Sequence, residues 1–160
     1  YSPENNMQLT ALADILQFRV IDRLREKEGG TYSPGVHLTY NKYPANRYAF
    51  TISFGCAPEN VNKLIADAKD EIRKLKTDGP SQTDITKFST EEERQYELHL
   101  KDNRYWLGWL VTRYENADDP AVILKYPERS KQGKTASGKA AANVYLNEEN
   151  FIKLLLLPEK

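Results

Sequence analysis

Apolar positions in the first part of the chain recur at steps of three and four residues. The order Ser2-Pro3-Glu4 is typical of a helix start, with Ser2 as the N-cap and Pro3 at the first helical position. Gly29 and Gly30 follow the apolar stripe, and glycine readily takes the positive φ that ends a helix. The pattern predicts one long amphipathic helix over residues 3–28, with its apolar stripe formed by Leu9, Leu12, Leu16, Val20 and Leu24.

After the glycines the apolar period changes to two. The first alternating run begins at Tyr32 and continues through Val36, Leu38 and Tyr40. A turn-rich interval over residues 41–46 separates it from a second alternating run, formed by Tyr48, Phe50, Ile52 and Phe54. We therefore expect an antiparallel hairpin with one apolar face.

The rest of the chain predicts mainly helices. One begins at Pro58 and is stopped by Gly79-Pro80, and others follow up to about residue 100, around Trp106, after Pro120 and over residues 140–146. Residues 130–138 are polar and predict a loop or a weak helix start. The charged run Glu91-Glu92-Glu93-Arg94 predicts a solvated helix face.

The last apolar run, Phe151 to Leu157, is continuous and predicts a strand buried on both faces. Together these elements favour a two-layer α+β fold, in which helices cover an antiparallel sheet, as a single domain over residues 1–160. Three strands are few for such a sheet, and the chain starts directly at a helix. We therefore expect the domain to be truncated at its N-terminus, with a further strand upstream.

Composition limits the classes of partner. In 160 residues, 23 Lys and Arg balance 23 Asp and Glu, so the net charge gives no field that attracts nucleic acid or an acidic membrane surface. The longest apolar run is too short to cross a bilayer. Cys56 is the only cysteine and has no disulfide or CxxC partner, so we expect it to pack as a small apolar residue. The sequence predicts neither a nucleic-acid nor a membrane partner.

Motifs for catalysis and for metal binding are missing from the sequence. A zinc hydrolase site requires two closely spaced histidines and a glutamate, whereas His37 and His99 lie far apart in different elements. The sequence has no GxSxG and no phosphate loop. Trp106 and Trp109 have helical spacing, which favours packing over a ligand site. The sequence therefore predicts no catalytic residue, metal ligand or cofactor in this chain.

Arg25 and Tyr32 are seven residues apart across the two glycines and have two interpretations. In one, the arginine complements the dipole of the helix C-terminus and the tyrosine packs with its hydroxyl in water. In the other, the reversal at the glycines brings both polar tips to the same edge of the sheet. There they would donate hydrogen bonds to carbonyls of an extended peptide.

Three segments of the chain carry a family resemblance. They are ALADILQFRVIDRLREKEGGTYSPGV, YAFTISFGCAPENVNKLI and NEENFIKLLLLPEK. Together they resemble the non-catalytic C-terminal domain of the M16 (pitrilysin/insulinase) zinc metallopeptidases, of the bacterial zinc protease type. The resemblance implies a domain that closes a chamber and contributes to substrate binding. The other half of such an enzyme carries the zinc and its inverted HxxEH motif.

The resemblance also implies roles for two residues. It assigns Arg25 and Tyr32 to substrate binding and leaves the chain inactive by itself, as part of a zinc-dependent endopeptidase. The implied partners are a peptide substrate and an N-terminal catalytic half, in the same polypeptide or in another subunit. A cell-envelope or periplasmic location is compatible with it. Two alternatives stay open: a catalytically inactive structural subunit of the same fold, and an unrelated peptide-binding α+β module.

Overall fold

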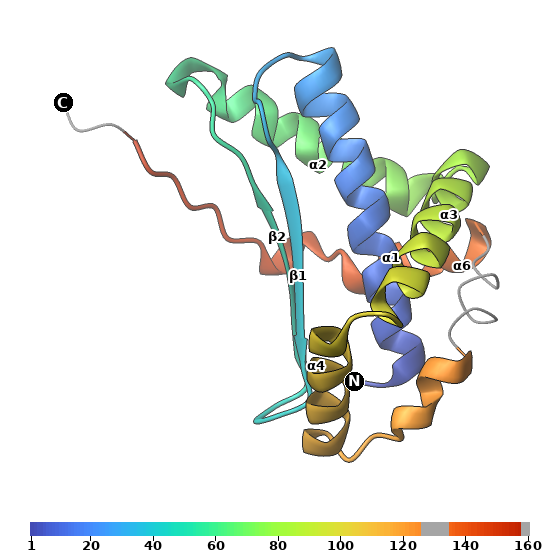
Figure 1. Ribbon diagram of the computed structural model, residues 1–160. Helices are drawn as coiled ribbons and strands as arrows, with labels where there is room; N and C mark the ends of the chain where they lie inside the picture. Colours follow the sequence, from blue (N-terminus) through green and yellow to red (C-terminus); the bar gives the residue numbers. More distant parts are fainter. Residues whose placement is uncertain (126–134, 158–160) are drawn as a thin grey trace.

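The computed structural model describes residues 1–125 and 135–157, and Figure 1 shows the arrangement of its elements. A two-stranded antiparallel hairpin lies on one side of the molecule, and helices lie on the other (Figure 1). In chain order the elements are α1 Pro3–Val20, η1 Ile21–Lys27, β1 Gly35–Asn41, β2 Arg47–Ser53, η2 Pro58–Asn60, α2 Val61–Thr77, α3 Gln82–His99, α4 Asn103–Glu115, η3 Pro120–Lys125, α6 Thr135–Tyr145 and η4 Glu148–Asn150.

The first helix forms where the sequence predicts it. Ser2 caps it by accepting a hydrogen bond from the Asn5 N–H at 3.1 Å, and Pro3 opens its first turn. Its last part, η1, has π-helical hydrogen bonding and carries the helix to Lys27. The predicted apolar stripe is buried, with Leu16, Val20 and Leu24 fully inaccessible to solvent. This helix is therefore the centre of the core.

The hairpin has the predicted apolar face. Val36 pairs with Ile52 and Leu38 with Phe50, so these side chains share one face of the hairpin. Val36, Phe50 and Ile52 on this face pack against the core around α1. The prediction that the first strand begins at Tyr32 is wrong, because β1 begins at Gly35. Gln17 of α1 holds the chain where β1 begins: the Val36 N–H donates to Gln17 Oε1 at 2.5 Å, and Gln17 Nε2 donates to the Pro34 carbonyl at 3.1 Å.

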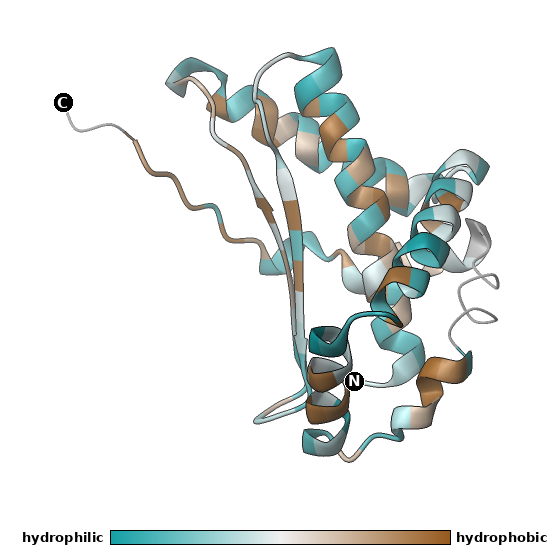
Figure 2. Ribbon diagram, in the orientation of Figure 1, coloured by the Kyte–Doolittle hydropathy of each residue, from teal (hydrophilic) through white to brown (hydrophobic). Residues whose placement is uncertain are grey.

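Three further helices complete the core. The same cluster as the α1 stripe buries Leu64 and Leu75 of α2, Phe88 of α3 and Ala142 of α6. At the start of α3, Ser81 and Asp84 form a reciprocal capping box, and Asp84 also receives hydrogen bonds from Arg19 at 2.7 and 3.2 Å. The expected α+β class is confirmed, and Figure 2 shows hydrophobic residues along the helices at its centre.

The final apolar run does not form the expected strand. Residues 151–157 are extended, every one of them is exposed, and among the described residues only β1 and β2 form a sheet. A strand needs a neighbour that accepts its backbone hydrogen bonds, and apolar composition does not supply that neighbour. This prediction was wrong. The part of the predicted loop at residues 130–134 lies outside the described residues.

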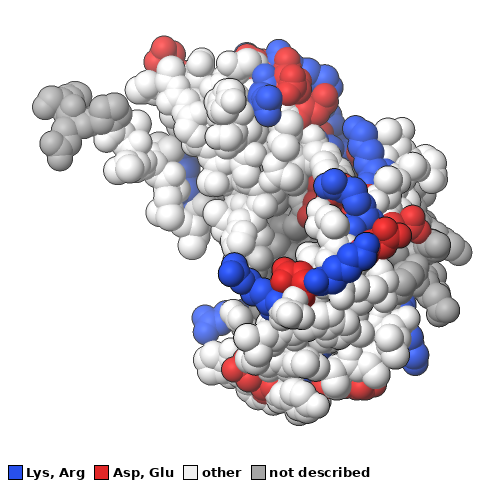
Figure 3. Space-filling model, viewed as in Figure 1, with Lys and Arg blue, Asp and Glu red and all other residues white. Residues whose placement is uncertain are grey.

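The surface carries both signs of charge. Figure 3 shows lysine and arginine interspersed with aspartate and glutamate on the face viewed. None of the described helices combines the length and the apolar character that crossing a membrane requires.

Candidate functional site

The turn between η1 and β1 depends on its two glycines. Gly29 has φ of +58°, in the left-handed region that glycine adopts without strain. Its N–H donates to the Arg25 carbonyl at 3.1 Å, and the Gly30 N–H donates to the Leu24 carbonyl, also at 3.1 Å. Gly30 lies against Leu64 so closely that an added Cβ would stand 2.7 Å from Leu64 Cδ2. The chain therefore reverses tightly, in contact with α2.

Four charged side chains fix this turn to α2. Arg23 contacts Asp67 at 2.6 Å and Glu28 at 3.2 Å, and Lys63 forms an ion pair with the other oxygen of Glu28. The hydrogen bond to Lys63 lowers the pKa of Glu28, and the bond to Asp67 raises the pKa of Arg23. Because these pairs join the end of η1 to the first half of α2, the ends of the turn are held in one position.

Arg25 and Tyr32 are neighbours at this turn. The Arg25 guanidinium carbon lies 5.5 Å from the centre of the Tyr32 ring, which is within the range of a cation–π contact. Both side chains face solvent, at 48% exposure for Arg25 and 83% for Tyr32. Arg25 also pairs with Glu26 at 3.3 Å. The glycine reversal therefore leaves the Arg25 and Tyr32 side chains beside each other, and Tyr32 lies three residues before the strand.

Neither histidine belongs to a metal site among the described residues. His37 is exposed on β1, and His99 stacks on Tyr105 with ring centres 4.2 Å apart. In residues 1–125 and 135–157 no group of three or more His, Cys, Asp or Glu side chains has the geometry to hold a metal ion. The indole N–H groups of Trp106 and Trp109 donate to the carbonyls of Leu100 and Pro120, as expected for packed side chains.

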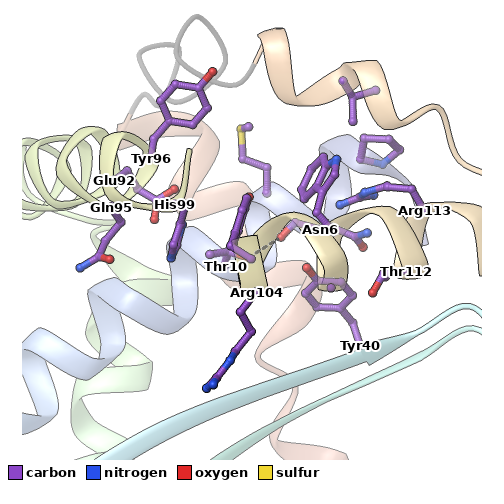
Figure 4. Close-up of a pocket in the computed structure, with 16 residues that line it drawn as sticks. Asn6, Thr10, Tyr40, Glu92, Gln95, Tyr96, His99, Arg104, Thr112 and Arg113 are labelled. Carbon is purple, nitrogen blue, oxygen red and sulfur yellow. Dashed lines mark hydrogen bonds between the residues drawn. The ribbon is translucent and has the colours of Figure 1, made fainter. Parts of the chain in front are cut away.

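A second feature, which sequence reasoning missed, is a cavity of about 510 Å³ between the start of α1, the end of α3 and α4 (Figure 4). Its polar walls include Glu92, His99 and Arg104, which are labelled in the figure. Glu92 was predicted to be solvated, but it faces inward because it lies one turn from the buried Phe88. The spacing of four residues between Phe88 and Glu92 is the sequence pattern that could have predicted this inward position.

Two carboxyl groups in this part of the molecule have raised pKa values. Burial, with a contribution from the charge of Glu91, raises the pKa of Asp14 to about 6. Burial also raises the pKa of Glu92 to about 7, and the charges of Asp14 and Glu91 add to the effect. Both groups therefore hold a proton more readily in the folded chain than in water.

Sequence comparison gives two matches. The family model described as the peptidase M16 inactive domain matches residues 1–119. A curated Arabidopsis thaliana protein described as zinc protease PQQL-like is 32% identical over 110 residues, which cover 66% of this chain and 12% of that protein. The chain thus spans about one eighth of the length of this relative.

Structure comparison finds the same fold among solved proteins. The periplasmic protease PqqL from Escherichia coli matches 91% of this chain and 16% of its own, with a TM-score of 0.75 and 20% identity. A peptidase M16 inactive domain from Pseudomonas fluorescens matches 91% of this chain and 35% of its own, with a TM-score of 0.73 and 20% identity. At these identities the two structures are evidence for the fold alone.

Proposed function

The chain belongs to the peptidase M16 family, as its inactive domain, and from this premise we propose that it closes the substrate chamber of a zinc-dependent endopeptidase and binds the peptide through Arg25 and Tyr32. Family membership rules out the alternative of an unrelated peptide-binding module. We also propose that residues 120–160 belong to the same domain. The burial of Ala141, Ala142 and Leu146 in the core of α1 supports this extension.

The observation that carries the proposal is the pairing of Arg25 and Tyr32 on an exposed, rigidly held turn. A side chain that only packs is covered by its neighbours, whereas Tyr32 is 83% exposed beside a guanidinium 5.5 Å away. Gly29 and the ion pairs of Glu28 fix the backbone that carries both residues. The two side chains therefore offer several hydrogen-bond donors from one fixed place.

These donors suit the carbonyl groups of an extended peptide. The guanidinium is planar and always charged, and its N–H groups bind carbonyl oxygens strongly. The phenol of Tyr32 adds one O–H donor beside them. Donors in this position would hold the peptide in register and stabilise negative charge that develops on a carbonyl oxygen. The role we assign to this chain is binding and orientation of the substrate.

Zinc would be held by another part of the full-length protein. In residues 1–125 and 135–157 no group of His, Cys, Asp or Glu side chains could hold a metal ion. In the catalytic half, zinc would supply the activation of the attacking water. This chain by itself is then expected to be inactive.

The test is peptide cleavage by the full-length protein with Arg25→Ala or Tyr32→Phe. Loss of a charged hydrogen bond of about 1.5–3 kcal/mol lowers kcat/KM roughly 10- to 150-fold for Arg25→Ala. Loss of a neutral bond of about 0.5–1.5 kcal/mol lowers it roughly 2- to 13-fold for Tyr32→Phe. Arg47→Ala and Tyr43→Phe are matched controls, because both residues are exposed away from the turn.

The outcomes separate the proposal from its remaining alternative. Unchanged cleavage by both variants, with the thermal unfolding temperature also unchanged, would reject the substrate-binding role. A full-length protein that binds no zinc and cleaves no peptide would instead support a structural subunit of the same fold. Loss of activity in the controls as well would indicate a general effect of surface substitution.

A further inference from the structure

The cavity between the start of α1, the end of α3 and α4 has a volume of about 510 Å³. Cavities of roughly 300–1,000 Å³ bind small organic molecules in many proteins. Apolar and aromatic side chains line part of this one, among them Met7, Tyr40, Trp109 and Val122. It therefore has the size and the walls that suit a ligand with an aromatic body.

Two polar side chains that line the cavity have buried atoms without a hydrogen-bond partner. Asn6 is 5% exposed, and neither its Oδ1 nor its Nδ2 has a partner within residues 1–125 and 135–157. Nε of Arg113 is buried and equally unpaired in this described part of the chain. A buried polar atom without a partner destabilises a fold, and folded proteins contain few of them. Their presence at one cavity indicates a partner that is bound there.

Both side chains are attached to well-held positions. Arg113 donates through Nη1 to Asp118 at 3.2 Å, and its guanidinium carbon lies 4.1 Å from the centre of the Trp109 ring. Asn6 lies in the first turn of α1, where its carbonyl accepts from the Thr10 hydroxyl at 3.0 Å. Figure 4 shows both residues at the cavity. The unpaired groups are therefore fixed before any ligand arrives.

The unpaired atoms define the chemical group that would satisfy them. Asn6 presents an acceptor and a donor side by side, and Arg113 adds a further N–H donor. A carboxylate only accepts, so it would leave Oδ1 of Asn6 unpaired, whereas an ammonium only donates, so it would leave Nδ2 unpaired. A carboxamide has both an N–H and a carbonyl oxygen. It can therefore pair with the Asn6 amide through two hydrogen bonds.

We propose that this cavity is a binding site for a small aromatic carboxamide, which Asn6 binds through two hydrogen bonds and the aromatic walls enclose. The carbonyl oxygen of the ligand has a second lone pair, which is available to an N–H donor such as Nε of Arg113. This inference is independent of the Arg25–Tyr32 site. The cavity lies at the start of α1, whereas Arg25 lies in η1, which follows the other end of that helix.

The test measures the binding of three fluorinated probes to the full-length protein by fluorine NMR. The probe para-fluorobenzamide carries the carboxamide, para-fluorobenzoate carries a carboxylate in its place, and fluorobenzene carries neither. We expect the benzamide to bind at least about tenfold more tightly than the other two, because each of those leaves buried atoms of Asn6 unpaired. Absence of benzamide binding or tighter binding of the benzoate would overturn the proposal. Equal affinities would also overturn it, because ordered water would then satisfy Asn6.

Substitutions assign the binding to this cavity. Asn6→Leu keeps the approximate size of the side chain, so it should remove the preference for the benzamide while fluorobenzene still binds. Asn5→Leu is the matched control, because Asn5 is the preceding residue of α1 and is exposed. This control should leave all three affinities unchanged. A preference for the benzamide that survives Asn6→Leu, or that is lost equally in Asn5→Leu, would contradict the assignment.

A second variant decides the question if Asn6→Leu disturbs the fold and loses fluorobenzene as well. Gly108 of α4 lines the cavity, and a Cβ added there meets nothing within 4 Å. Gly108→Phe should therefore fit without a clash at its Cβ and occupy space at the cavity wall. All three probes should bind at least about tenfold more weakly to this variant. Unchanged binding of the benzamide to Gly108→Phe would overturn the proposal.

Discussion

The contact between Gly30 and Leu64 allows a quantitative test of how the turn is held. A Cβ at position 30 would stand 2.7 Å from Leu64 Cδ2 and 2.9 Å from Leu64 Cδ1. Ordinary contact begins at 3.4 Å, so the atoms must separate by about 0.7 Å. Leu64 is only 1% exposed and has no room to rotate outward. Gly30→Ala should therefore overpack the core and lower the free energy of unfolding by about 1–3 kcal/mol.

A double-mutant cycle isolates this contact from other effects of the substitution. Leu64→Ala alone should cost about 2–5 kcal/mol because it leaves a cavity. In that background the new methyl group of Gly30→Ala enters space that the leucine has vacated. Gly30 lies outside the left-handed region, so alanine fits its backbone. The double variant should then be more stable than the sum of the single variants predicts, by at least about 1 kcal/mol.

The assay is urea unfolding of the 160-residue chain and its variants. Free energies of unfolding are compared between variants whose m-values agree. Gly55→Ala is the matched control, because a Cβ there meets nothing within 4 Å, and its effect should stay within about 0.5 kcal/mol. Additive effects of Gly30→Ala and Leu64→Ala, within about 0.5 kcal/mol, would refute the close approach of the turn to α2.

Two further predictions concern the carboxyl groups. The folded chain raises the pKa of Asp14 from 3.8 to about 6 and the pKa of Glu92 from 4.5 to about 7. The stabilisation that results from these shifts is therefore fully present below about pH 4, and it is lost as the pH rises through 6 and 7. After allowance for solvent screening, the double variant Asp14→Asn, Glu92→Gln should have a free energy of unfolding about 1–2 kcal/mol higher than the unmodified chain at about pH 8. If the free energy of unfolding depends on pH in the same way in both chains, the prediction is contradicted. Asp118→Asn keeps the size of the side chain but removes the charge that Arg113 and Lys42 bind. It should destabilise the chain by about 1–3 kcal/mol and accelerate hydrogen exchange in α4, whereas unchanged exchange would show that the cluster does not hold the helix.

Local patterns predicted most of the fold. The steps of three and four in α1, the diglycine stop and the period of two in the hairpin each follow from the chain itself, and each is present. The final run could not be predicted in the same way. Whether residues 151–157 form a strand depends on a pairing partner, and local composition does not reveal one. The start of β1 was placed too early because the parity of Tyr32 matched a strand that begins at Gly35.

The candidate site was predicted less completely than the fold. The glycines between Arg25 and Tyr32 indicated a reversal, and the structure brings the two side chains to 5.5 Å. The ion pairs that join the reversal to α2, Arg23 with Asp67 and Glu28 with Lys63, link residues far apart in the sequence, and no local pattern reveals them. The inward position of Glu92 was overlooked because its charged neighbours masked the helical spacing from Phe88.

The most direct measurement of the proposed role is photo-crosslinking from position 32 of the full-length protein. Tyr32 is replaced by benzoylphenylalanine, and Tyr43, another exposed tyrosine, is replaced in a separate control. If Arg25 and Tyr32 bind the substrate, light attaches a bound peptide to position 32 and not to position 43, and excess unlabelled peptide suppresses the adduct. An adduct that is absent at position 32, or equally strong at position 43, would contradict the account.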